Sequence, residues 1–141
     1  MLFIENVPAI AIDRGTHRIS AKSAILIQIT EPDGMFPVPM KDFQRVFQFR
    51  IWDVVEPITD SLGRVLEPIS DEDAQNLVLA LQYAQENNLN VVVHCAAGIC
   101  RSGAVTEIGT MLGFQSIHDN RLPNQAIKYG MMKALGLTYD S

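Results

Sequence analysis

Residues 91–103 read VVVHCAAGICRSG: three valines, a His-Cys pair, a run of small residues, then an arginine and a serine. The residues from Leu89 to Val93 are apolar and mostly β-branched, which is typical of a strand covered on both faces in an α/β sheet. From Ser102 onward, apolar residues recur at helical spacing. We therefore predict a strand, a short loop and a helix in this order, with the loop at the carboxyl end of the strand.

Further strands are predicted on the amino-terminal side of this unit. Ala24–Ile29 is a β-branched apolar run and predicts a buried central strand, while Val46–Trp52 is aromatic with partial alternation. Ala9–Ile12 is a weaker strand candidate. Residues Val54–Ile69 contain two prolines and a glycine and show little periodicity, so we predict a long surface loop there.

Two more helices complete the pattern. Ser70 is a predicted N-cap, and the helix after it is expected to stop at Asn87-Asn88. Its predicted buried face consists of Ala74, Leu77, Val78, Leu81 and Ala84. Pro123 and Asn124 open a last helix, which ends at Gly136. The alternation of strands and helices predicts an α/β fold with a central, mostly parallel sheet flanked by helices.

Length and composition narrow the classes of function. A chain of 141 residues with 48% hydrophobic residues suits a single domain spanning residues 1–141. There are 16 acidic and 11 basic residues and no basic run, so we expect neither nucleic acid nor a membrane as partner. The sequence shows no leader pattern and no apolar stretch of bilayer length, from which we expect a cytoplasmic protein.

The two cysteines, Cys95 and Cys100, lie five positions apart in one loop. That arrangement does not suit the disulfide framework of a secreted scaffold, so any role they have is chemical. No His or Cys pair has the spacing of a zinc site, and we expect no metal and no cofactor.

The predicted loop has the chemistry of an anion site. A strand that turns through a small loop into a helix leaves several backbone N–H groups free, with the positive end of the helix dipole behind them. Small residues allow close approach of an oxyanion, Gly98 can adopt a positive φ angle, and Arg101 adds a planar fork for two phosphate oxygens. The expected phosphate-binding residues are Ala96, Ala97, Gly98, Ile99, Cys100 and Arg101.

The same field favours an ionised cysteine. A helix N-terminus and a nearby cation lower the pKa of a cysteine, so Cys95 is the predicted nucleophile. The Ser102 hydroxyl is expected to donate to the sulfur when the sulfur leaves. His94 is expected to have a structural role, holding the loop through a bond to backbone.

The segment from His94 to Gly103 resembles the signature loop of the protein tyrosine and dual-specificity phosphatases, and Phe49–Asp53 resembles the strand and loop that carry the general acid of that family. The resemblance covers most of residues 24–112. It implies a dual-specificity-phosphatase-like fold, a cysteinyl-phosphate on Cys95 and an aspartic acid that protonates the leaving group. It implies no metal.

Two aspartates are candidates for the acid. Asp53 follows the predicted strand, although its distance from Cys95 along the chain is somewhat longer than is usual in the family. Asp60 has the more usual gap but does not end a strand. We take Asp53 as the candidate and keep Asp60 as the alternative.

Cys100 suggests a possible redox role. The spacing Cys95-x4-Cys100-Arg101-Ser102 resembles the loop of the low-molecular-weight tyrosine phosphatases, although that family has it near the start of the chain. A Cys95–Cys100 disulfide would shield the nucleophile from irreversible oxidation. This is a hypothesis from spacing alone, and the alternative for Cys100 is plain packing.

The resulting hypothesis is a hydrolase of phosphoprotein, acting on phosphotyrosine or with dual specificity. A small phosphorylated metabolite is an alternative substrate. The rival hypotheses are a phosphate-binding module with little turnover, and a sulfur-transfer or arsenate-reducing enzyme. Arg101 and Ser102 favour phosphate chemistry over the latter.

Overall fold

The structure is a computed structural model and describes residues 1–117 and 120–137. Its larger sheet is parallel, with strand order β3-β2-β6-β1-β7. The strands are β1 (Phe3–Pro8), β2 (Ala24–Thr30), β3 (Arg45–Arg50), β6 (Asn90–Cys95) and β7 (Gln115–Ile117). The helices are α1 (Ala9–Arg14), the short 3-10 helix η1 (Ala21–Ser23), α2 (Asp71–Glu86), α3 (Arg101–Met111) and α4 (Gln125–Ala134). The predicted α/β class is confirmed.

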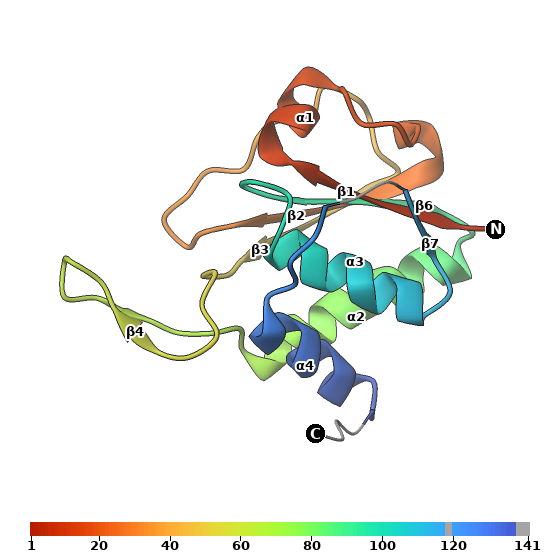
Figure 1. Cartoon of the computed structure of the whole chain (residues 1–141). Helices are drawn as coiled ribbons and strands as arrows, with labels where there is room; N and C mark the ends of the chain where they lie inside the picture. The colour runs from red at the N-terminus through yellow and green to blue at the C-terminus, as the bar shows by residue number, and fades with distance from the viewer. Residues whose placement is uncertain (118–119, 138–141) are drawn as a thin grey trace.

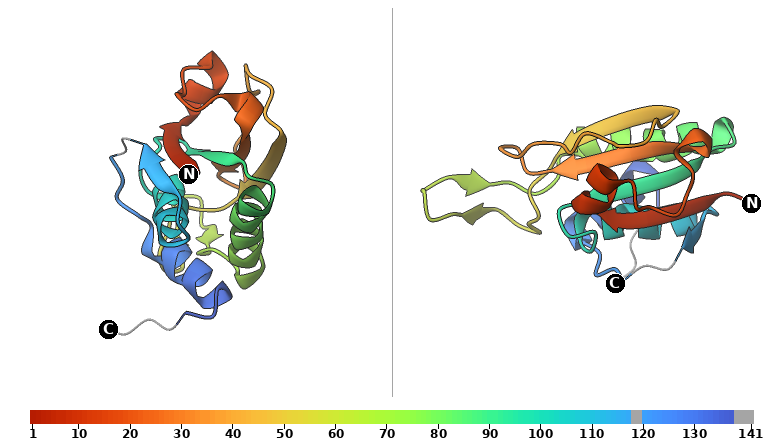
Figure 2. Two further views of the ribbon diagram at one scale, coloured as in Figure 1. Left: turned by 90° about the vertical axis from the view of Figure 1, so that its right-hand side faces the viewer. Right: turned by 90° about the horizontal axis from the view of Figure 1, so that it is seen from above.

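Helices cover both faces of the sheet (Figure 1). Helices α2, α3 and α4 lie on one face, and α1 lies on the other, which the views in Figure 2 also show. Successive side chains of β1 point to opposite faces of the sheet and therefore contact different helices. Ile4 belongs to the core under α2 and α3, whereas Val7 belongs to the core under α1.

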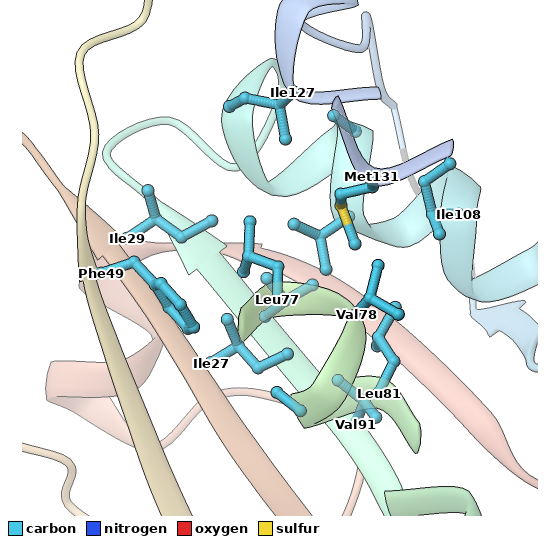
Figure 3. Close-up of a cluster of buried hydrophobic side chains, with 14 of the residues drawn as sticks. Ile27, Ile29, Phe49, Leu77, Val78, Leu81, Val91, Ile108, Ile127 and Met131 are labelled. Carbon is cyan, nitrogen blue, oxygen red and sulfur yellow. The ribbon is translucent and has the colours of Figure 1, made fainter. Parts of the chain in front are cut away.

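The larger core is built from the sheet, α2 and the two later helices. Ile27, Leu81 and Ile127 in it are fully buried (Figure 3). The five residues predicted for the buried face of α2 are all buried, and the Ser70 hydroxyl accepts a hydrogen bond from Asp73 N at 3.1 Å. This core fixes β6 and α3, and with them the loop that joins the two.

The strand prediction at Ala9–Ile12 is wrong, because these residues belong to α1. Pro8 has extended backbone angles and precedes the first turn, and Gly15 ends the helix with a φ of 68°. An alternation of four small and apolar residues is too short to separate a strand from a buried helical turn. The strand lies just before it, at β1, where no strand was predicted.

The predicted loop at Val54–Ile69 contains a small antiparallel hairpin, formed by β4 (Ile58–Thr59) and β5 (Val65–Leu66). Its turn is stabilised by Asp60, whose Oδ1 accepts hydrogen bonds from two backbone amides, and by Gly63 at a φ of 78°. Strands of two residues are too short to produce a periodic pattern. The hairpin projects away from the sheet in Figures 1 and 2.

Candidate active site

The loop of residues 96–100 joins the end of β6 to the start of α3, as predicted. It is pressed against the end of β1. The Ala9 amide donates to the Ala96 carbonyl at 3.2 Å, and Gly98 has a φ of 70°. A Cβ atom on Gly98 would lie 2.5 Å from Val7 C and from Pro8 N. Both the backbone angle and the contact therefore require glycine at this position.

The carbonyls on the far side of the loop are bonded to the segment that precedes α4. The Ile99 carbonyl accepts from Leu122 N at 3.1 Å, and the Cys100 carbonyl accepts from Asn124 N at 2.9 Å. In a trans peptide the C=O and N–H groups point in opposite directions. The amides of Cys100 and Arg101 are consequently turned away from that segment.

Cys95 is buried at the base of this loop, and its Sγ atom lies 3.1 Å from Ser102 Oγ. Burial alone would raise the pKa of the Cys95 thiol. Hydrogen bonds from the Ser102 hydroxyl and from three backbone amides outweigh burial and lower the pKa below the usual cysteine value. The three amides belong to Ser102, Ile99 and Gly98. The site thus favours a thiolate.

Arg101 is 4% exposed and is held from both sides. One terminal nitrogen donates to the Ile51 carbonyl at 3.0 Å, and the other donates to Glu31 Oε1 at 2.8 Å. Its Nε has no hydrogen-bond partner among the described residues. A buried guanidinium with a free donor is costly unless an anion satisfies it, which suits the role predicted for Arg101.

Glu31 is a site residue that the sequence did not reveal. It follows β2, whose carboxyl end lies beside that of β6 in the sheet. Partial burial acts to raise the pKa of Glu31, but bonds from its own backbone amide and from Arg101 lower it. The carboxylate therefore stays ionised and fixes the guanidinium in one orientation. The available signal was an acidic residue directly after a strand that is mostly apolar and fully buried.

Asp53 lies beside the loop. Asn124 Nδ2 donates to Asp53 Oδ1 at 2.8 Å and to the Val54 carbonyl at 3.2 Å. Asn124 is also the N-cap of α4, because its Oδ1 accepts from Ile127 N. The buried Asn124 thus ties the candidate acid to the loop of residues 96–100, through its backbone N–H, and to the start of α4, through its side chain. The sequence predicted that Pro123 and Asn124 open the helix, but not this contact.

Asp60, the alternative acid, has local partners instead. Its carboxylate bonds to the Arg64 side chain and to the turn backbone of the hairpin. Hydrogen bonds from Arg64 and Leu62 lower the pKa of Asp60, although desolvation acts in the opposite direction. A carboxylate held ionised in this way is a poor proton donor, which favours Asp53.

His94 faces the α1 layer, on the opposite side of β6 from Cys95. Its Nδ1 lies 3.3 Å from the Cys95 carbonyl. Burial lowers the pKa of His94 to about 4, and the charge of Arg101 acts in the same direction. The imidazole is therefore neutral near pH 7, as suits a structural group.

Cys100 is partly buried, and both cysteines are free thiols. Burial raises the pKa of Cys100, as do the charges of Asp53 and Cys95. The two cysteines are thus unlike each other, since their surroundings lower the pKa of Cys95 and raise the pKa of Cys100. The disulfide hypothesis stays a prediction.

One cleft among the described residues lies apart from the candidate anion site. This cleft of about 420 Å³ is lined by residues 15, 17–22 and 40–42, and it includes no residue of the loop. Within residues 1–117 and 120–137, no three His, Cys, Asp or Glu side chains are grouped so that they could hold a metal ion. No helix in the same ranges is both long and apolar enough to cross a bilayer.

Comparison with protein-family models and with curated proteins gives no match for this chain. The function of the protein is therefore inferred from the residues and the geometry of the site.

Proposed function

We propose that this protein is a phosphomonoester hydrolase that works through a cysteinyl-phosphate on Cys95. One observation supports this above all. A buried cysteine whose pKa is lowered lies at the base of a loop of backbone amides, next to a buried arginine with an unpartnered Nε. A thiolate beside a cradle for a tetrahedral dianion is arranged to attack phosphorus.

In the first step, the Cys95 thiolate attacks the phosphorus, the S–P bond forms, and the bond from phosphorus to the leaving oxygen breaks. The Asp53 carboxylic acid gives its proton to that oxygen. The loop amides and Arg101 hold the equatorial phosphate oxygens, where charge is concentrated in the transition state. Glu31 holds the guanidinium in place for this contact.

In the second step, the Asp53 carboxylate takes a proton from water, and the water oxygen attacks the phosphocysteine. The S–P bond breaks and inorganic phosphate is released. The Ser102 hydroxyl, 3.1 Å from the sulfur, donates to the departing thiolate. The Cys95–Ser102 contact supports the roles that the resemblance to the tyrosine and dual-specificity phosphatases implies for these two residues.

A phosphorylated protein is the proposed substrate, with tyrosine or dual specificity. Ala96 and Ala97 are exposed, so the loop is open to a residue carried on a protein surface. A small phosphorylated metabolite is the second candidate. A nucleophilic thiol must stay reduced to react, and Cys95 is a free cysteine. We therefore place the protein in a compartment that keeps thiols reduced, such as the cytoplasm.

Turnover of p-nitrophenyl phosphate tests the proposal. Wild-type protein is expected to hydrolyse it, Cys95→Ser is expected to be inactive, and Cys100→Ser is expected to keep most of the activity. Phosphate binding without turnover would instead identify a phosphate-binding module. Activity that survives in Cys95→Ser would rule out the proposed nucleophile.

A further inference from the structure

Asn6 is a polar residue at a core-facing position of a central strand. It lies on β1 between Ile4 and Pro8, and it pairs in register with Val93 on β6. Its exposed fraction is 8%, and Ile4 and Val93 beside it are fully buried. An amide in such surroundings is costly unless its groups are bonded. This cost points to a role beyond packing.

The amide contacts the hydroxyl that serves Cys95. The Ser102 hydroxyl bonds to Asn6 Oδ1 at 2.5 Å and lies 3.1 Å from Cys95 Sγ. The Asn6 Nδ2 atom is buried and has no hydrogen-bond partner among the described residues. The three side chains come from β1, α3 and the end of β6, and they form one chain of polar contacts.

A serine hydroxyl has one proton and cannot donate to two acceptors at once. If the proton points to Asn6 Oδ1, the sulfur must be the donor in its own contact with Ser102, and Cys95 is then a neutral thiol. If Cys95 is a thiolate, the Ser102 proton must point to the sulfur. Asn6 Oδ1 would then face the Ser102 oxygen as a second acceptor, which is repulsive.

We infer that Asn6 is a positioning residue whose amide reverses with the ionisation of Cys95, so that its Nδ2 donates to Ser102 while Ser102 donates to the thiolate. This inference rests on the proposed function. When Cys95 ionises, its proton goes to solvent, the Ser102 hydroxyl turns from Asn6 to the sulfur, and the amide turns by half a revolution about its Cβ–Cγ bond.

The reversed chain has two consequences. Asn6 Nδ2, the donor that now has no partner, becomes bonded to Ser102, and Oδ1 takes its place as the group without a partner. The bond it gives to Ser102 polarises the hydroxyl and strengthens the bond from Ser102 to the sulfur. Asn6 thus stabilises the thiolate both as the free nucleophile and as the group that leaves from the phosphocysteine, without touching the substrate.

The test measures the rate of alkylation of Cys95 by iodoacetamide against pH, with the modified peptide quantified by mass spectrometry. Asn6→Leu replaces the amide with an apolar group of similar size and is expected to raise the apparent pKa of Cys95 by about one unit. If Asn6→Leu does not fold, Asn6→Ala is measured in the same way. An unchanged pKa in the folded variant would overturn the inference.

Two controls separate this role from a general effect on packing. Thr106→Val removes a buried hydroxyl one turn along α3, which donates to the Ser102 carbonyl at 2.9 Å, and it is expected to leave the pKa of Cys95 unchanged. In a Ser102→Ala background, Asn6→Leu is expected to cause no further shift. An equal shift there would show that Asn6 does not act through Ser102.

The readout also separates the two proposals. Alkylation requires no phosphatase activity, so a coupled shift in a protein that does not hydrolyse phosphomonoesters would refute the proposed function and leave the role of Asn6 intact. Turnover that is lost in Cys95→Ser, with no shift in Asn6→Leu, would refute only the role of Asn6.

Discussion

Asn124 Nδ2 lies 2.8 Å from Asp53 Oδ1 and donates a hydrogen bond to it, which joins two residues 71 positions apart in the chain. Asn124 Oδ1 accepts a hydrogen bond from the Ile127 amide in the first turn of α4. The Asn124 backbone N–H donates to the Cys100 carbonyl in the loop of residues 96–100. The candidate acid is thus held against a rigid helix start and not left on a free loop.

The role of Asp53 predicts a dependence on the leaving group. Asp53→Asn is expected to lower kcat by about 10²- to 10⁴-fold for phosphotyrosine or phenyl phosphate, and by much less for p-nitrophenyl phosphate, whose leaving oxygen needs little protonation. Asp60→Asn, in the hairpin turn, is the matched control and is expected to retain activity. If Asp60→Asn shows this loss of kcat and Asp53→Asn does not, the general acid is Asp60.

Arg101→Lys is expected to reduce kcat by about 10²- to 10³-fold, because an ammonium cannot reproduce the planar fork or keep the bonds to Glu31 and Ile51. Arg50→Lys is the control. Arg50 bonds to the carbonyls of Pro32 and Gly34, outside the phosphate loop, and its replacement is expected to leave most of the activity. Steady-state kinetics of the two variants compare the two arginines directly.

Gly63 and Gly98 have similar φ angles, so alanine substitutions at the two positions separate the cost of backbone strain from the cost of a steric clash. Gly63→Ala in the hairpin turn meets no atom within 4 Å, so it is expected to cost only the strain of a positive φ, about 1 kcal/mol. Gly98→Ala adds a clash with the β1 backbone and is expected to cost about 3 kcal/mol or more, with loss of phosphate binding. Urea unfolding and phosphate titration measure both. Similar costs would contradict the packing of the loop on β1.

Because His94 is buried in its neutral form, the protein is expected to lose stability in acid. Its folded pKa of about 4 lies below the unfolded value near 6.5, so the unfolded chain binds the extra proton first as the pH falls. Stability that is complete above pH 6.5 is therefore lost progressively as the pH drops through about 4. Relative to a His94→Asn variant, the wild-type protein is expected to lose about 3 kcal/mol of unfolding free energy over this range. Parallel pH profiles for the two proteins would show that His94 is not buried in its neutral form.

The sequence predicted what local patterns encode. The strand, loop and helix around Cys95 were placed correctly because a β-branched run, small loop residues and helical spacing are adjacent in the chain. The buried face of α2 and the Ser70 cap follow from periodicity and capping in the same way. Ala9–Ile12 was predicted wrongly because four residues carry too little periodicity.

The partners of the site were missed because they depend on which segments the sheet brings together. Glu31, Asn6 and Asn124 are each distant from the loop in sequence, and nothing in their own neighbourhoods indicates Arg101, Ser102 or Asp53. The parallel strand order places the ends of β1, β2 and β6 side by side, and this is what assembles the site. The local signal for Glu31 was its place just after a predicted strand, whereas Asn6 lies in a strand that the sequence did not predict.

The most direct measurement is a rapid acid quench during hydrolysis of a phosphotyrosine peptide, followed by mass spectrometry of the peptide that contains Cys95. The Ser102→Ala variant should be included, because a slower departure of the thiolate makes the intermediate accumulate. We predict a phosphoryl group on the sulfur of Cys95, in larger amount in Ser102→Ala than in the wild-type protein. Steady turnover with no phosphoryl group on Cys95 in either protein, or with the label on another residue, would contradict the proposed mechanism.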